Sequence, residues 1–371
     1  MDWSTRTITR TPKAVGQLTR LFSTMMLAVA LLLSSLAQAE YQIIISEQSE
    51  AFPVSPNSNV GVLDNINSLT DRPDISANGQ YIGLEIDLLG SSETNDAAVV
   101  IDLMTGSRTV IAREGITTVP GSLLGFINSQ VEVNNTGQAV FSADTDLTTP
   151  PAPGDEIVSF WDGSTLNHYV IEGDIAPAGA PNSVYGTQYD DVQLTNAGDI
   201  GGDFDTTGPN ALDDFLAVGS TLLLSSNTDP LDGFVVQSGS GRHEVFTEFD
   251  VSANGTSYIA EIRTDDDSAF DTYVAVDGVL TVQEGITSHT TPGGRPVVYD
   301  GATDSDVADG GHWILDAFSG DSIDYTLVNG VAKLAEGEIA PDGSILSSMS
   351  GVSINSNGDY ISLWNLSLIH I

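Results

Sequence analysis

Acidic side chains are the residues of this 371-residue chain whose type and spacing could support chemistry. The sharpest group is the run from Asp265 to Asp267, followed by Asp271. Calcium takes about six to eight oxygen ligands, and a loop with closely spaced aspartates can supply several of them. Asp265, Asp267 and Asp271 are therefore the candidate calcium ligands, although the run does not match an EF-hand loop. The alternative, which the sequence favours, is that these are solvated loop carboxylates of a uniformly acidic protein.

A second set of acids is periodic. Each of its four members stands five residues before a glycine that marks an internal repeat; the members are Asp74, Glu132, Asp250 and Asp306. Such a set could form a ring of carboxylates at the mouth of a central channel. The sequence favours a simpler interpretation, in which each acid belongs to the polar face of a strand.

No residue is predicted to be catalytic. The chain has no cysteine, no Gly-x-Ser-x-Gly and no Ser-x-x-Lys, so the usual nucleophile signatures are absent. Its five histidines, at 168, 243, 289, 312 and 370, form no pair with zinc-ligand spacing. A glycoside hydrolase would need one pair of carboxyl groups, and nothing singles out such a pair among 51 acids. Calcium is the only cofactor that the sequence suggests.

Three markers recur in phase about every 57 residues, which indicates a tandem repeat. The first is a short polar phrase that ends in glycine, at Gly79, Gly137, Gly198, Gly255, Gly311 and Gly358. The second is a turn glycine, at Gly106, Gly163, Gly219, Gly278 and Gly330. The third is Glu-Gly, at Glu114, Glu172, Glu284 and Glu336.

Each repeat reads as strand, turn, strand, loop, strand, turn, strand. Its apolar runs are short, rich in Val, Ile, Leu, Phe and Tyr, and bounded by Gly, Asn, Asp and Pro. Asp162-Gly163, Asp277-Gly278 and Asn329-Gly330 suit two-residue hairpin turns, which require positive φ. In the marker phrase a side-chain oxygen is expected to cap the turn and the glycine to take the left-handed conformation.

A unit of this size is too small to fold alone, so neighbouring units must bury one another. We predict an all-β fold: a β-propeller of four-stranded antiparallel blades, with six blades of which the last is truncated. Residues 40–365 form its single domain, with units that start near residues 62, 120, 181, 239, 297 and 350. The strand Tyr41–Ser46 could complete the last blade. A β-solenoid or a stacked β-sandwich array is the alternative, and residues 366–371 read as a non-native tail.

The first 39 residues are typical of an export signal. A basic leader precedes the apolar run Leu21–Leu36, and Ala37-Gln38-Ala39 fits a signal-peptidase site. A retained membrane anchor is less favoured because the apolar core is shorter than the roughly 20 residues that a spanning helix needs. The formal net charge of −40 would repel nucleic acid and anionic membranes, so neither is expected as a partner. We expect a monomer that is extracellular, at the cell surface or periplasmic.

The phrase Asn134-x-x-Gly137-x-x-x-Phe141 resembles the NxxGxxxF tandem-repeat proteins, which are secreted bacterial proteins of unknown function that often carry a C-terminal anchoring tail. Residues 172–177 and 336–341 resemble that family's phrase Glu-Gly-Asp-x-Ala-Pro. Other units lack the phenylalanine: Gly83, Gly202, Ile259, Leu315 and Ser362 stand four residues after their marker glycines. The resemblance implies a propeller-like repeat array at the cell surface and brings no catalytic residues.

These observations favour a non-enzymatic binding or structural module that contacts an extracellular carbohydrate or protein through the loops of one face. A calcium-stabilised structural protein is a second expectation. An extracellular polysaccharide hydrolase or lyase on the same scaffold is the alternative, and it would require inward-facing acids that converge with an arginine or histidine.

Overall fold

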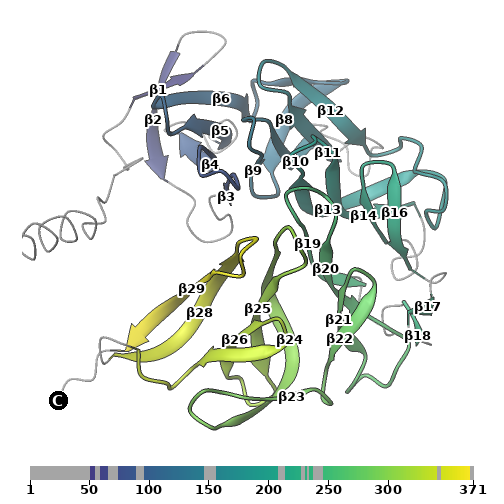
Figure 1. Cartoon of the computed structure of the whole chain (residues 1–371). Coiled ribbons are helices and arrows are strands. Elements are labelled where there is room, and N and C mark those ends of the chain that lie inside the picture. The colour runs from purple at the N-terminus through teal and green to yellow at the C-terminus, as the bar shows by residue number, and fades with distance from the viewer. Residues whose placement is uncertain are drawn as a thin grey trace, which may run out of the picture. The chain divides into compact units, whose positions relative to one another are not determined.

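The computed structural model describes residues 51–54, 59–65, 74–88, 96–145, 156–207, 214–226, 230–231, 234–236, 245–340 and 344–367. These residues form strands, turns and bends (Figure 1). Within the same ranges no helix has the length and apolar character that a membrane span requires. The predicted signal peptide and the predicted strand Tyr41–Ser46 lie outside the described residues. The predicted tail begins inside the last strand, which ends at Ser367.

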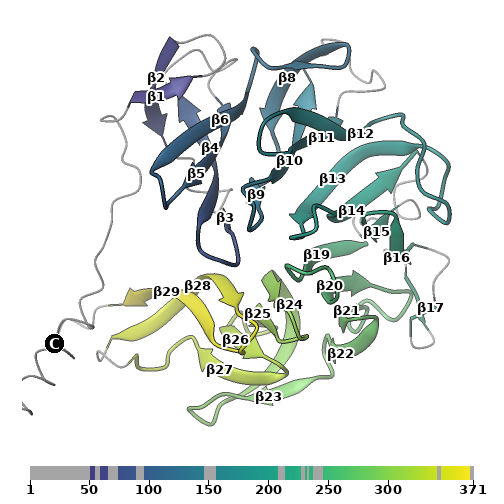
Figure 2. The ribbon, with the colours of Figure 1, turned by 45° about the horizontal axis from the view of Figure 1, so that its top comes forward.

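The strands form a series of antiparallel sheets that follow one another along the chain (Figure 2). Sheet one contains β1 (Ala51–Val54), β2 (Asn59–Asn65), β3 (Asp74–Ile75), β4 (Tyr81–Leu88), β5 (Asp96–Asp102) and β6 (Ser107–Arg113). Sheet two contains β7 (Thr118–Val119), β8 (Ser122–Ile127), β9 (Glu132–Val133), β10 (Ala139–Thr145), β11 (Glu156–Trp161) and β12 (Leu166–Ile171). Sheet three contains β13 (Tyr185–Leu194), β14 (Ile200–Thr206), β15 (Phe215–Val218) and β16 (Thr221–Ser225).

A two-stranded hairpin, β17 (Pro230–Leu231) and β18 (Phe234–Val235), precedes the remaining sheets. Sheet four contains β19 (Phe246–Val251), β20 (Tyr258–Arg263), β21 (Thr272–Val276) and β22 (Val279–Gln283). Sheet five contains β23 (Ser288–Thr290), β24 (Pro296–Val307), β25 (Trp313–Ser319), β26 (Asp324–Val328) and β27 (Val331–Ala335). Sheet six has two described strands, β28 (Ile345–Ile354) and β29 (Tyr360–Ser367).

This topology confirms the predicted all-β propeller of four-stranded antiparallel blades with an incomplete last blade. In sheets three and four the strands pair in chain order, β13 to β16 and β19 to β22. Sheet five adds only the short β23 to the same pattern. In sheets one and two the first strand is interrupted, so that β2 and β3, or β8 and β9, pair with the same second strand.

The hydrophobic core lies between successive sheets rather than within any one of them. Phe141 of sheet two packs with Ala98 and Val100 of sheet one, whereas its neighbour Val140 packs toward sheet three. Both side chains are fully buried, because the second strand of a blade is covered on both faces. Each blade therefore depends on its neighbours for burial, as the repeat length predicted.

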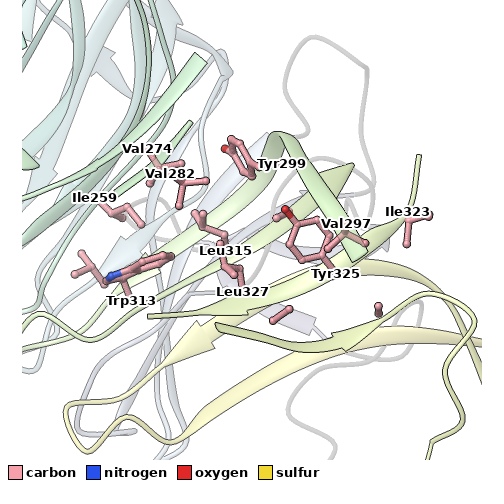
Figure 3. Close-up of a cluster of buried hydrophobic side chains, with 14 residues drawn as sticks. Ile259, Val274, Val282, Val297, Tyr299, Trp313, Leu315, Ile323, Tyr325 and Leu327 are labelled. Atoms are coloured by element: carbon pink, nitrogen blue, oxygen red, sulfur yellow. The ribbon is translucent and has the colours of Figure 1, made fainter. Parts of the chain in front are cut away.

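Figure 3 shows the core between sheets four and five. Ile259, Val274 and Val282 of sheet four meet Trp313 and Leu315 of sheet five, with Tyr299 and Tyr325 beside them. Burying such a set of large apolar side chains contributes about 1.5–3 kcal/mol for each one. This inter-sheet burial is a main source of stability in a chain without disulfides.

The marker phrases form one recurring turn. In all six, the glycine has a positive φ, between 69° and 86°, and its N–H donates to the carbonyl oxygen three residues earlier. This confirms the predicted left-handed glycine. Asp277-Gly278 and Asn329-Gly330 also have positive φ at both residues, as a type I′ turn requires. Asp162-Gly163 differs, because it begins a four-residue connection between β11 and β12 in which Asp162 Oδ1 accepts N–H bonds from Ser164 and Thr165.

Adjacent marker turns are hydrogen-bonded to one another. The N–H of Asn78 donates to Asn135 Oδ1 at 2.6 Å, and the N–H of Asn135 donates to Asn196 Oδ1 at 2.9 Å. The N–H of Asn254 donates in the same way to Asp309 Oδ1 at 2.9 Å. The second residue of the phrase therefore fastens its turn to the turn of the preceding blade.

The register corrects the sequence alignment of Gly83 and Ile259 with Phe141. In the turns of sheets one and four the first N–H bonds to the residue five positions later, at Tyr81 and Ser257. In sheet two the corresponding bond spans four residues. The extra residue shifts the second strand by one position and reverses the faces of the sheet on which its side chains lie. Gly83 and Ile259 therefore correspond to Val140, not to Phe141.

Gly83 marks a close approach between sheets one and two. A Cβ atom built at this position would overlap the carbonyl oxygen of Val131. We expect Gly83→Ala to lower the free energy of unfolding by about 1–3 kcal/mol, the usual cost of overpacking. Gly320→Ala is the matched control, because its Cβ would have only ordinary contacts and should change stability by less than about 1 kcal/mol. Equal chemical-denaturation midpoints for the two variants would contradict the close approach.

Asn134 combines a turn cap with an inter-sheet bond. Its Oδ1 accepts the N–H groups of Thr136 and Gln138, and its Nδ2 donates to the Thr195 carbonyl at 3.1 Å. We expect Asn134→Ala to lower the free energy of unfolding by about 2 kcal/mol, because the substitution leaves buried groups unpaired. Asn355 makes the equivalent turn bonds in an exposed setting, so Asn355→Ala should cost about half as much. Urea denaturation of both variants measures the difference, and a similar loss in each would show that the inter-sheet bond contributes little.

Candidate functional site

The candidate site is built from one equivalent position in each first strand, here named the ring position. The six ring positions each pair with one residue of the second strand. They are Asp74, Glu132, Gln193, Asp250, Asp306 and Ser353, opposite Gly83, Val140, Gly201, Ile259, Ile314 and Ile361. In the first five sheets, the face of the sheet on which the side chains of these pairs lie is covered by the following sheet. In sheet six, where no described sheet follows, Ile361 is 67% exposed.

Three ring carboxylates bind the next sheet directly. Asp74 Oδ2 accepts the N–H of Val133 at 2.6 Å. Asp250 Oδ2 accepts the N–H of Val307 at 2.7 Å, and Asp306 Oδ2 accepts the N–H of Ile354 at 2.7 Å. In each case the donor is the residue that follows the ring position of the next sheet. The ring carboxyls therefore form a regular set of inter-sheet hydrogen bonds.

A second set of carboxylates makes similar bonds to the next sheet from positions two residues before the ring position. Asp191 Oδ2 accepts the N–H of Phe249 at 3.1 Å, and Asp304 Oδ2 accepts the N–H of Val352 at 2.8 Å. In sheet three the ring position is Gln193, so Asp191 supplies the bond to sheet four. The pairing of β13 with β14 shifts register between Asp190 and Gln193, and Asp191 has a φ of 46°. Spacing from the marker glycine could not have identified Asp191.

The four acidic ring residues perturb one another. Burial is the main cause that raises the pKa of Asp74, to about 6, and the charge of Asp306 raises it further. Burial also raises the pKa of Glu132 well above its ordinary value, with further contributions from the charges of Asp74, Asp250 and Asp306. The pKa of Asp250 is raised by burial and then by the charge of Asp306. The charges of these carboxyls, which belong to the first strands of sheets one, two, four and five, therefore act on one another across the blades.

Hydrogen bonds only partly offset these effects. Burial raises the pKa of Asp306, while bonds from Ile354, Ser353 and Asp250 act in the opposite direction. Glu132 accepts a bond from Gln130 and, at 8% exposure, is the most buried of the four acids. Asp74, Asp250 and Asp306 are half-buried residues. Desolvation of the carboxyls, with like charges as a further cause, therefore disfavours ionisation at this site.

Of the two interpretations of these acids, the mutual influence of their charges favours a ring of carboxyls, although each acid also lies in its own first strand. A carboxyl cluster of this kind can hold and share protons, and carboxyls with raised pKa are also the groups that act as general acids. No arginine, lysine or histidine is among the groups that most influence the pKa values of the four acids.

The candidate calcium ligands lie between β20 and β21. Asp265 Oδ1 accepts the N–H of Val235, Asp267 Oδ1 accepts the N–H of Ala269, and Asp271 is buried with its Oδ1 near the Thr272 hydroxyl. Within the ranges that the structure describes, no three His, Asp or Glu side chains are grouped so that they could hold a metal ion. Calcium binding by these aspartates stays a prediction from the sequence.

Comparison with known proteins gives likeness of fold only. No family model matches the chain, and no curated protein matches it. Among solved structures it is similar to a prolyl endopeptidase (13% identity, 85% of this chain and 46% of that chain, TM-score 0.41). It is also similar to an oligogalacturonate lyase in complex with manganese (11% identity, 80% and 76%, TM-score 0.41) and to the Myceliophteria thermophila Cps50 (Swd1) β-propeller domain (10%, 84% and 88%, 0.37). The chain spans less than half the length of the prolyl endopeptidase, and likenesses this distant assign no activity.

Proposed function

We propose that this chain is an exported binding module on a β-propeller scaffold, and that it contacts an extracellular carbohydrate or protein. The observation that carries the proposal is the contrast between the two ends of the strands, each of which is here called an edge of the blade array. Because the strands are antiparallel, all marker turns lie at one edge, together with the turns between third and fourth strands. Side chains of the marker turns, such as Asn134 and Asn135, hydrogen-bond to neighbouring sheets, so this edge holds the scaffold together.

The opposite edge carries the connections between second and third strands, and these differ from blade to blade. They link Leu88 to Asp96, Thr145 to Glu156, Thr206 to Phe215, Arg263 to Thr272 and Ser319 to Asp324. Their sequences share no phrase comparable to the marker turns. Variable loops on a regular scaffold are the usual location of binding residues, so we assign ligand binding to this variable edge.

The strong negative charge restricts the ligand. A formal net charge of −40 disfavours acidic polysaccharides as well as nucleic acid, because like charges repel at low ionic strength. A neutral or amine-bearing glycan, or a basic protein surface, is compatible with this charge. The resemblance to secreted NxxGxxxF repeat proteins and the signal-like first 39 residues support an extracellular setting for the interaction.

One observation favours the alternative of a polysaccharide hydrolase or lyase. Asp74, Glu132 and Asp250 are neighbouring carboxyls with raised pKa values, as a general acid requires. Their bonds to backbone N–H groups of the next sheet, however, give Asp74 and Asp250 a structural role that a catalytic acid does not need. We therefore rank the binding module first.

A panel of immobilised neutral, amine-bearing and acidic glycans tests the proposal with the whole chain at low salt. We expect retention on a neutral or amine-bearing glycan and none on an acidic one. Phe270 is an exposed aromatic residue of the variable edge, and Phe270→Ala should weaken retention about tenfold, as loss of a stacking contact would. Met104 is 79% exposed at the opposite edge, and Met104→Ala should leave retention unchanged.

Two results would count against this function. Equal effects of Phe270→Ala and Met104→Ala would place binding away from the variable edge. Release of reducing ends or unsaturated sugars from any glycan, abolished by Glu132→Gln, would replace the binding module with the enzyme.

A further inference from the structure

The ring carboxyls occupy a special place in the blade interfaces. Asp74, Asp250 and Asp306 each join their own sheet to the next one through a single backbone N–H. The charges of the same carboxyls also influence one another. Any change in their charge therefore acts on the bonds that hold the first strands together.

The main influences on the ring carboxyls come from acidic or uncharged groups of neighbouring first strands. Asp74 on β3 is influenced by Glu132 and by the charge of Asp306. Glu132 on β9 is influenced by the charges of Asp74, Asp250 and Asp306. Asp250 on β19 faces Asp306 on β24, and β28 contributes Ser353 to Asp306. On β13 the ring position is the uncharged Gln193. No cation is among the main influences on these four acids, so ionisation of each carboxyl adds repulsion between the ring residues.

We propose that the ring carboxyls form a pH-responsive contact between successive sheets. The first strands are held together firmly when carboxyls of the ring are protonated and less firmly when all of them are ionised. A protonated carboxyl still offers its carbonyl oxygen to the N–H of the next sheet. Protonation therefore keeps the inter-sheet bond and removes the repulsion, whereas full ionisation keeps the bond and maximises the repulsion.

The direction follows from proton linkage. The pKa of Asp74 is raised from 3.8 to about 6, so between these values the folded chain holds a proton that the unfolded chain has released. Stability must therefore fall as pH rises through this window, and the loss is complete above pH 6 for this group. The raised pKa values of Glu132, Asp250 and Asp306 act in the same direction. Asp102 and Asp162, whose pKa values are lowered by hydrogen bonds despite some desolvation of Asp102, act oppositely but only at more acidic pH.

Amide hydrogen exchange tests this contact residue by residue in the whole chain. The N–H groups of Val133, Val307 and Ile354 report on the ring, because ring carboxylates accept them. The N–H groups of Phe249 and Val352 are matched controls, held by carboxylates outside the ring. Between pH 5 and pH 8, after correction for intrinsic exchange, we expect protection of the three ring amides to fall about tenfold and that of the controls to fall less. Equal changes in both groups, or no change, would overturn the proposal.

Glu132→Gln provides an independent test. It removes one charge from the ring without removing an acceptor that a described N–H of the next sheet uses. We expect its melting temperature at pH 8 to rise by at least about 2 °C above wild type, and the difference to shrink at pH 5. Asp321→Asn removes one exposed charge elsewhere and should shift neither value.

Should Glu132→Gln fail to fold, Asp250→Asn serves instead, because its amide oxygen can still accept the Val307 N–H. A variant of either kind that folds and follows the wild-type pH dependence would show that ring charge does not control this contact.

Discussion

The hydrogen bond from a backbone N–H of one blade to a side-chain carboxylate of the preceding blade is the constraint on which this structure depends. In sheets three and four the first strand is an edge strand; β19, for example, pairs only with β20. An edge strand presents N–H groups that need partners. Here Asp191 and Asp250 supply such partners across the interfaces on either side of sheet four. The abundant aspartate therefore does more than keep the chain soluble.

This solution has an electrostatic cost. The carboxyls that accept bonds from the next blade also raise one another's pKa values, as the charge of Asp306 does for Asp74 and Asp250. The raised pKa values of Glu132 and Asp250 include this effect. Gln193 and Ser353, which occupy the ring positions of sheets three and six, reduce the number of charges. The interface thus balances satisfied N–H groups against like-charge repulsion.

Local rules made much of the fold predictable from sequence. Gly278 and Gly330 specify their turns through the positive φ that only a few residues adopt, and the period of the markers implied that blades bury one another. The face of each side chain was less predictable. One additional residue in the turn after Ser76 moved Gly83 to the opposite face from Phe141, and the spacing from the marker glycine hid that change. The sequence offered a carboxylate ring that includes Asp74 and Asp306 as one interpretation, but it could not decide for the ring, because the mutual influence of these groups depends on how distant blades meet rather than on any local pattern.

Amide and carboxyl side chains both accept inter-blade bonds in this protein. At the marker turns Asn135 accepts the N–H of Asn78, whereas Asp309 accepts the N–H of Asn254. At the ring an amide would also bring two N–H donors, which neighbouring carboxylates can accept. A carboxyl brings no obligatory donor and can take up a proton when its neighbours are ionised. An acceptor whose charge is adjustable suits an interface between first strands, and four of the six ring positions carry one, whereas Gln193 and Ser353 occupy the other two.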